Sequence, residues 1–74
     1  MNINNFDLNL LRAFDVLMQE RNVSNAAKRM HLSQPAMSNT LSRLRDLLDD
    51  PVLVRTRQGM QPTPKAKSLE KSIR

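Results

Sequence analysis

Short, uncharged hydrogen-bonding side chains recur at helical spacing in the middle of this chain. Gln34, Ser38 and Ser42 are four residues apart, so they share one face if the segment is a helix. Asn39 and Arg43 lie beside them. Amides and hydroxyls both donate and accept hydrogen bonds. This face is therefore suited to a partner that presents donors and acceptors together.

The residue types that catalysis and metal binding require are scarce. The chain has no cysteine, one histidine and one glycine, so no nucleophile–base pair, phosphate-binding loop or thiolate metal site can be assembled. Asp49 and Asp50 are adjacent, so their side chains diverge, and they are better explained as a helix stop. We predict that the chain is not an enzyme and holds no metal or cofactor.

Length and composition predict one small, mainly α domain. The 74 residues are rich in Leu, Ala, Met, Lys and Arg, which favour helices, and contain few β-branched residues. No apolar run approaches the ~20 residues that cross a bilayer, and the first residues do not resemble a signal peptide. The absence of cysteine fits a reducing compartment. We expect a cytoplasmic protein without a membrane partner.

Basic residues form two clusters in a chain of net charge +5. The first cluster contains no carboxylate, and the second contains only Glu70. The members are Arg21, Lys28, Arg29, Arg43 and Arg45 in the first, and Arg55, Arg57, Lys65, Lys67, Lys71 and Arg74 in the second. Two such clusters indicate a polyanion partner, although on charge alone simple solubility is an equally good explanation.

Apolar periodicity predicts two helices before residue 31. The first begins with Asp7 as N-cap and ends near residues 21–22; Ser24 is the expected N-cap of a second helix that reaches about Met30. Ala26 and Ala27 in the second helix allow close packing against a neighbour. The apolar positions are Leu10, Leu11, Phe14, Leu17 and Met18 in the first helix, and Val23, Ala26, Ala27 and Met30 in the second.

A third helix is predicted from Ser33, its N-cap, to about Leu48. Pro35 suits the first turn, where backbone amides have no intrahelical partner. The Asp49–Asp50–Pro51 segment ends this helix, because the residue before proline avoids helical geometry. Its buried face comprises Met37, Leu41, Leu44 and Leu48.

The remaining residues predict a small hairpin and a last helix. Residues 52–54 and 60–61 are expected to form short strands around a turn at 57–59. Thr63 and Pro64 then begin a helix that carries an apolar stripe and is still running at Arg74. The stripe consists of Ala66, Leu69 and Ile73.

A short helix, a tight turn and a longer helix over residues 24–48 predict a helix-turn-helix motif, whose second helix lies in the DNA major groove. There Gln34 can bond adenine, Pro35 and Ala36 can touch a thymine methyl group, and Arg43 can reach guanine or phosphate. Ser24 and Ser33 are placed at helix N-termini, which favour anions. For Ser33, capping alone explains the residue at least as well.

In these motifs the sequence resembles the LysR-type transcriptional regulators of bacteria. The resemblance covers nearly the whole chain, and the FDLNLL and GMQPTP segments are similar to the nodulation-regulator-like branch. Two departures are Asp49 and Leu53, where the family commonly has Gly and Phe. The matching segments are Ala26–Ala27, Met30–Leu32, Ser33–Ala36 with Ser38, Leu44, Leu48, the VLVR segment ending at Arg55, and Thr63.

The resemblance implies a winged helix-turn-helix DNA-binding domain at residues 1–62, whose hairpin wing approaches the minor groove or backbone through Arg55, Arg57 and Gln58. For Arg55, a salt bridge to Asp49 or Asp50 is an equally good explanation. It also implies that residues 63–74 begin a linker helix that forms a homodimer, weak in this chain, through Ala66, Leu69 and Ile73.

The implied partner is double-stranded DNA with a dyad-symmetric site in the bacterial nucleoid. A small-molecule effector and higher oligomers are expected only for an intact regulator with a further domain.

Two other binding functions are weighed against this one. A protein-interaction module using the last helix would not explain the loss of acids between Arg21 and Arg45. RNA binding would call for aromatic stacking, but Phe6 and Phe14 are the only aromatic residues and neither lies in a basic strand.

Overall fold

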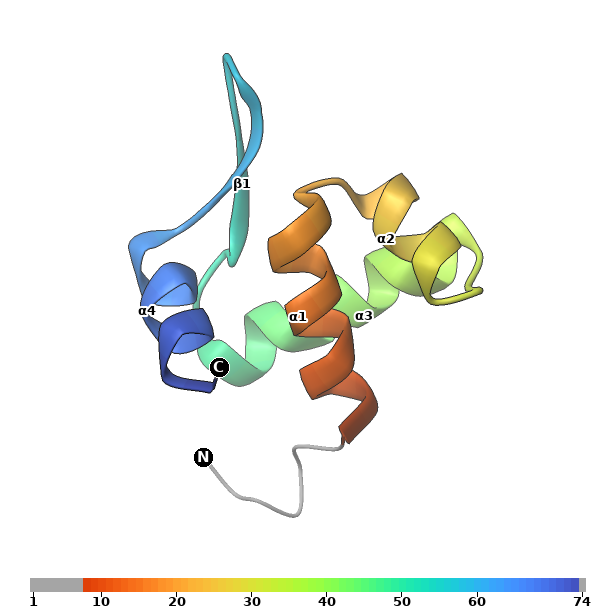
Figure 1. Ribbon diagram of the computed structural model, residues 1–74, viewed down its shortest axis with the longest axis horizontal. Helices are drawn as coiled ribbons and strands as arrows, with labels where there is room; N and C mark the ends of the chain where they lie inside the picture. Colours follow the sequence, from red (N-terminus) through yellow and green to blue (C-terminus); the bar gives the residue numbers. More distant parts are fainter. Residues whose placement is uncertain (1–7, 74) are drawn as a thin grey trace.

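The computed structural model describes residues 8–73 and contains four helices and a two-stranded antiparallel sheet. The helices form a body from which the hairpin projects (Figure 1). The predicted fold class, a mainly α winged helix-turn-helix, is confirmed. The elements are α1 (Leu8–Glu20), α2 (Val23–Arg29), α3 (Gln34–Leu48), β1 (Leu53–Thr56), β2 (Gly59–Pro62) and α4 (Pro64–Ile73).

The core lies where α1, α2 and α3 meet, and every pair of these helices is in contact. Phe14 and Leu17 from α1 are fully buried with Met37 and Leu44 from α3. The alanines of α2 are buried as well, and their small side chains let the neighbouring helices approach closely. This packing fixes α3 with its apolar face inward, as its periodicity predicted.

Asn22, and not Ser24, is the N-cap of α2. The Asn22 side chain accepts a hydrogen bond from the Asn25 N–H at 2.9 Å, and Asn22 has extended backbone angles. The prediction for Ser24 was wrong: the N-cap and the start of α2 lie two residues earlier than predicted, and Ser24 lies inside the first turn of the helix. Both residue types cap helices well, so residue type does not distinguish them. The N-cap predicted at Asp7 lies outside the described residues.

Two residues with left-handed backbone angles follow α3. Asp49 has φ +52° and caps the helix with its N–H bonded to Arg45 O. Val52 has φ +67° and is fully buried. It was predicted to lie in the first strand, but β1 begins one residue later, at Leu53. The Val52 N–H donates to Asp50 Oδ2 at 2.8 Å. These turns redirect the chain from α3 into the hairpin.

The hairpin is the predicted wing, with strands slightly longer than expected. Leu53 pairs with Pro62 at its root, and Thr56 pairs with Gly59 at its tip. Gly59 has φ +98°, a conformation that suits glycine. The Thr56 hydroxyl donates to Gly59 O and accepts from the Gln58 N–H, so the turn at residues 57–58 is internally bonded.

Helix α4 begins as predicted, with Thr63 as its N-cap. The Ala66 N–H donates to Thr63 Oγ1 at 3.1 Å. Lys65 Nζ donates to Leu48 O at 2.6 Å and so satisfies a carbonyl at the end of α3. Helix α4 packs against α1 and β2. Within residues 8–73, no helix has the length and apolar character needed to cross a bilayer.

Candidate nucleic-acid interface

The polar face of α3 is open to solvent along the helix. Its members are exposed, while the opposite face is buried in the core. Thr40, between the two faces, bonds its hydroxyl to Ala36 O at 2.9 Å and is directed back onto the helix. The exposed members are Gln34, Ser38, Asn39, Ser42 and Arg43.

The N-terminus of α3 contains a cap and two small apolar groups. The Ala36 N–H donates to Ser33 Oγ at 3.2 Å, so Ser33 is the N-cap of α3, as predicted. Pro35 lies in the first turn with its ring exposed, and Ala36 is half-buried. Pro35 thus presents an apolar surface beside Gln34.

A groove of about 520 Å³ lies between the start of α2, the start of α3 and the wing. It brings together Ser24, Gln34, Arg55 and Gln58, which come from three separate parts of the sequence. Ser24 is half-buried at its edge, and the other three are exposed. The groove is lined mainly by polar side chains and backbone, so it fits a polar, anionic partner better than an apolar one.

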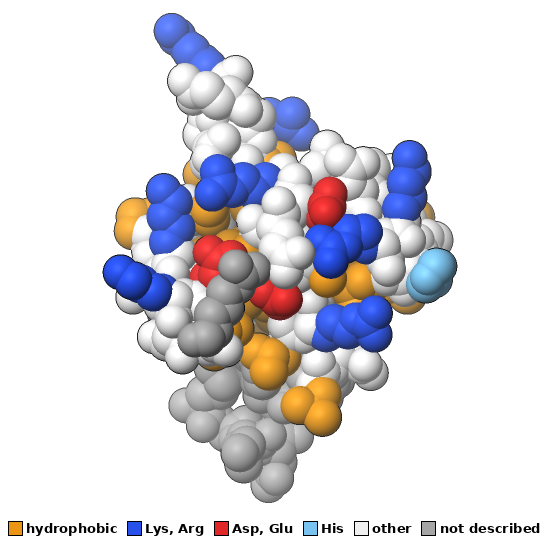
Figure 2. Space-filling view, in the orientation of Figure 1, with side chains coloured by type: hydrophobic (Ala, Val, Ile, Leu, Met, Phe, Trp, Pro, Cys, Tyr) orange, Lys and Arg blue, Asp and Glu red, His pale blue; other side chains and the backbone are white. Residues whose placement is uncertain are grey.

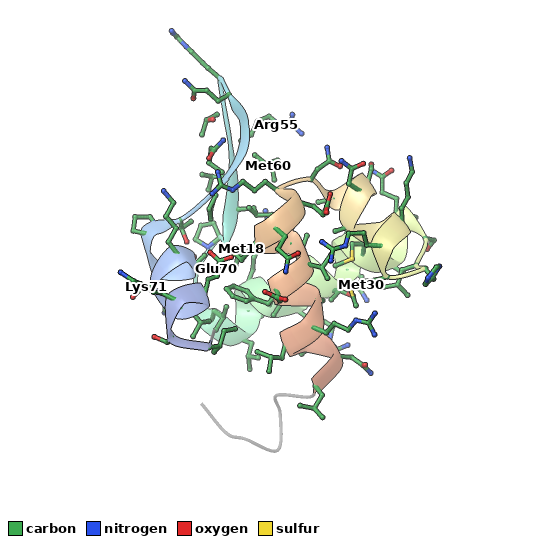
Figure 3. All side chains as sticks on the ribbon, viewed as in Figure 1. Met18, Met30, Arg55, Met60, Glu70 and Lys71 are labelled. Carbon is green, nitrogen blue, oxygen red and sulfur yellow. The ribbon has the colours of Figure 1, made fainter. Side chains whose placement is uncertain are left out.

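The wing carries two exposed cations: Arg55 faces this groove, and Arg57 lies at the tip of the wing. Arg55 projects from β1 on the side where α2 lies, above Met60 (Figure 3). Within the described residues, the salt bridge considered between Arg55 and Asp49 or Asp50 does not form. Arg57 is exposed in the turn. Figure 2 shows a basic side chain at the tip of the wing and others around the body.

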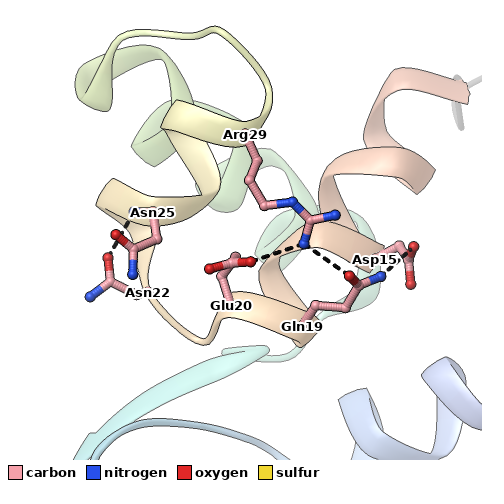
Figure 4. A network of polar contacts seen from close by, with 6 residues as sticks. All are labelled: Asp15, Gln19, Glu20, Asn22, Asn25 and Arg29. Atoms are coloured by element: carbon pink, nitrogen blue, oxygen red, sulfur yellow. Dashed lines mark hydrogen bonds and ion pairs between the residues drawn. The ribbon is translucent and has the colours of Figure 1, made fainter.

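Two arginines of the first basic cluster, Arg29 and Arg45, are engaged within the fold. Arg29 Nη1 lies 2.9 Å from Glu20 Oε2 and donates to Gln19 Oε1, which links α2 to α1 (Figure 4). Arg45 donates to Pro51 O and Leu53 O at the root of the wing. The carboxylate-free cluster in the sequence therefore overstated the number of cations available to a partner, because Glu20 from the preceding helix reaches Arg29.

Arg21 is engaged as well, and sequence reasoning did not single it out as a site residue. Its Nη1 donates to Gln61 Oε1 at 3.0 Å, and both residues line the groove. The two residues are 40 positions apart. No spacing rule connects such residues.

The predicted dimerisation residues differ in exposure. Ala66 is 1% exposed and packs within the domain's own core, so its side chain is not available to a partner. Leu69 is half-buried against the same core, whereas Ile73 is 41% exposed. Within residues 8–73, no cluster of three His, Asp or Glu side chains is arranged to hold a metal ion.

Comparison with known proteins agrees with this geometry. The family model described as bacterial regulatory helix-turn-helix protein, lysR family, matches residues 8–67. The HTH-type transcriptional activator NahR of Pseudomonas putida is 49% identical over 73 residues, which are 99% of this chain and 24% of NahR.

Two solved structures are similar to the fold. The probable transcriptional regulator PA0477 from Pseudomonas aeruginosa superimposes with a TM-score of 0.87 at 42% identity, over 96% of this chain and 24% of that one. Vibrio fischeri DarR in complex with DNA superimposes with a TM-score of 0.80 at 28% identity, over 97% of this chain and 24% of DarR.

The chain thus spans about a quarter of the length of these relatives. The family model covers most of the chain, including α2, α3 and the wing. This chain belongs to the lysR family of bacterial regulatory helix-turn-helix proteins.

Proposed function

We propose that this chain is the DNA-binding part of a LysR-type transcriptional regulator and binds double-stranded DNA sequence-specifically. The observation that carries the proposal is the groove in which Gln34 at the start of α3 and Arg55 of the wing line the same space. A helix with an exposed polar face beside a basic hairpin matches the shape and charge of a duplex. Membership of a regulatory family also means that the chain is not an enzyme.

Base reading is assigned to the exposed face of α3 in the major groove. We assign Gln34 to bidentate hydrogen bonding with the adenine edge, and Pro35 with Ala36 to contact with a thymine methyl group. Arg43 reaches guanine or a phosphate. Ser38, Asn39 and Ser42 provide further donors and acceptors along the same face. Within residues 8–73, the side chains of Gln34, Ser38, Asn39, Ser42 and Arg43 are exposed and bonded to no other side chain, so they need not be released before binding.

Phosphate binding is assigned to the wing and to the helix N-termini. Arg55, Arg57 and Gln58 are exposed on the hairpin, where they can follow the backbone or the minor groove. Ser24 lies in the first turn of α2, and Ser33 caps α3. Backbone N–H groups at such positions favour phosphate oxygens. The structure of DarR with DNA, which has a similar fold, supports this arrangement.

Dimerisation is assigned to α4, within residues 63–74, next to the DNA-binding domain of residues 1–62. Leu69 and Ile73 offer the contact, and a two-fold partner would place two α3 helices about one DNA turn, or a multiple of it, apart. Two side chains offer only a small contact area between the protomers, so the dimer of this chain alone is weak. The intact regulator would add an effector domain and higher oligomers, and would act in the cytoplasm on the nucleoid.

Selection of bound duplexes from a random pool tests this function. We expect a dyad-symmetric consensus to be enriched, and the enrichment to weaken with Gln34→Ala. Failure to enrich any sequence at moderate salt would contradict the proposal and favour a protein-interaction module. Competition by single-stranded RNA as effective as that by the selected duplex would instead indicate RNA binding.

A further inference from the structure

A side-chain hydrogen bond joins the end of α1 to the wing. Arg21 follows the last residue of α1, and its Nη1 donates to Oε1 of Gln61 in β2 at 3.0 Å. The root of the wing is also held by apolar packing, since Leu53 is buried and Met60 is half-buried against the core, and by hydrogen bonds that Arg45 donates to Pro51 O and Leu53 O. Beyond the root, β1 is exposed from Val54 onward.

The wing depends on its root for its orientation. An isolated two-stranded hairpin is marginally stable, so contacts with the body decide where its tip lies. In the strand register, Gln61 pairs with Val54, next to the pair formed by Arg55 and Met60. Met60 lies between the wing and the upper end of α1 in Figure 3, directly below Arg55. The hydrogen bond from Arg21 to Gln61 is therefore made at the strand pair next to the one that contains Arg55, the wing cation that faces the groove.

Arg21 and Gln61 also line the groove that holds Gln34 and Arg55. The distance across this groove determines whether α3 and the wing can contact one duplex together. We propose that Arg21 is a positioning residue, which acts through Gln61 to hold the wing at the spacing from α3 that the duplex requires. This inference rests on the proposed DNA binding.

The backbone conformation at Arg21 is one that glycine adopts more readily than arginine. Arg21 has φ +52°, in the left-handed region that favours glycine. A long cationic side chain is present there nevertheless, and it spans from α1 to β2. Arg21→Gly consequently removes the side chain while leaving a backbone that glycine adopts readily, so the variant is expected to remain folded.

The competing explanation is that Arg21 binds a phosphate directly and independently of Gln61. The two explanations differ in the effect of Gln61→Leu, which removes the acceptor without altering any charge. They also differ in how each variant combines with Arg57→Ala at the wing tip. If Arg21 positions the wing, losing either partner of the bond displaces Arg57 from the duplex.

The test measures affinity for the selected duplex against salt concentration, with and without Arg57→Ala, in three backgrounds: the unaltered chain, Arg21→Gly and Gln61→Leu. In the unaltered chain, Arg57→Ala is expected to flatten the slope of log affinity against log salt by about one unit. In the Gln61→Leu and Arg21→Gly backgrounds, we expect it to flatten the slope by less than half as much. Arg12→Ala, which removes an exposed cation of α1 outside the groove, is the control for the charge lost in Arg21→Gly and should retain the full effect. Circular dichroism melting verifies folding of each variant.

Two results would overturn the inference and leave the proposed function intact. One is an undiminished effect of Arg57→Ala in the Gln61→Leu background. The other is a loss of affinity in the Arg21→Gly/Gln61→Leu double variant that equals the sum of the two single losses, which would make Arg21 an independent phosphate contact. Failure of the unaltered chain to bind any duplex would instead remove the proposed function itself.

Discussion

Thr63 Oγ1 donates a hydrogen bond to Asp50 Oδ2 at 2.5 Å. This bond joins the N-cap residue of α4 to the turn that follows α3. The same carboxylate oxygen accepts from the Val52 N–H, and the Thr63 N–H donates to Val52 O at 3.0 Å. The end of α3, the root of the wing and the start of α4 therefore form one bonded junction. The hydrogen bond from Thr63, with smaller contributions from the Val52 N–H and the charge of Lys65, lowers the pKa of Asp50 against the opposing effect of its burial.

This junction predicts a pH-dependent contribution to stability. Because the pKa of Asp50 is lower in the folded state, its carboxylate stabilises the fold above the ordinary aspartate pKa. That contribution is lost as pH falls through the lowered value. Asp50→Ala should therefore lower Tm at pH 7, and the difference from the unaltered chain should shrink in acid below about pH 4. Thermal unfolding across pH, followed by circular dichroism, measures this difference.

Asp50→Asn is the control for this prediction, because the amide oxygen can still accept from Val52 and Thr63 without the charge. It should fall between the unaltered chain and Asp50→Ala at pH 7. An Asp50→Ala difference that is constant from pH 7 to pH 2 would mean that the carboxylate charge plays no part.

Gln34 is predicted to determine base preference without supporting the fold. Gln34→Ala should cost about 1–3 kcal/mol on the preferred site and relax preference at one or two positions per half-site. Because Gln34 is exposed, Tm should be unchanged. Affinities measured across single-base variants of the site test this. Ser33→Ala is the contrasting variant: losing the bond to the Ala36 N–H should destabilise the fold by about 1 kcal/mol. An unaltered ranking of site variants with Gln34→Ala would refute the assigned role.

Arg57 is predicted to contact phosphate and not bases. Arg57→Ala should weaken binding to all sequences to a similar degree and flatten the salt slope by about one unit. Titration of a specific and a scrambled duplex at several salt concentrations measures both effects. A change in sequence preference at constant salt slope would assign Arg57 to base or groove reading instead.

We predict different outcomes for substitutions at two apolar positions of α4. Ile73 is exposed, so Ile73→Asp should abolish pairing on a two-half-site duplex while preserving half-site affinity and Tm. Leu69 packs partly against the core, so Leu69→Asp should lower Tm as well. Lys67→Ala, which lowers the net charge by the same unit from an exposed position off the apolar stripe, controls for electrostatics.

Sedimentation of free and DNA-bound protein, with melting curves for each variant, distinguishes these cases. One protomer per two-half-site duplex at saturation with the unaltered chain would contradict the dimer.

The sequence alone was sufficient for features that depend on neighbouring residues. The spacing of Met37, Leu41, Leu44 and Leu48, together with Ser33 and Pro35, predicted α3 and its buried face correctly, because helix periodicity and capping act within one or two turns. The same is true of Thr63 at the start of α4. Even locally, equivalent residue types left the choice between Asn22 and Ser24 open, and the structure decided it.

Tertiary structure decided which side chains, polar and apolar, remain available to a partner. Arg29 pairs with Glu20, Arg21 reaches Gln61, and Ala66 is consumed by the domain's own core. Arg55, by contrast, forms no salt bridge with Asp49 or Asp50. Hydrogen bonds and ion pairs act over a few ångströms in space, whatever the separation along the chain. The exposed polar face of α3 could thus be predicted from local periodicity, whereas the groove that joins it to the wing exists only once distant segments have packed together.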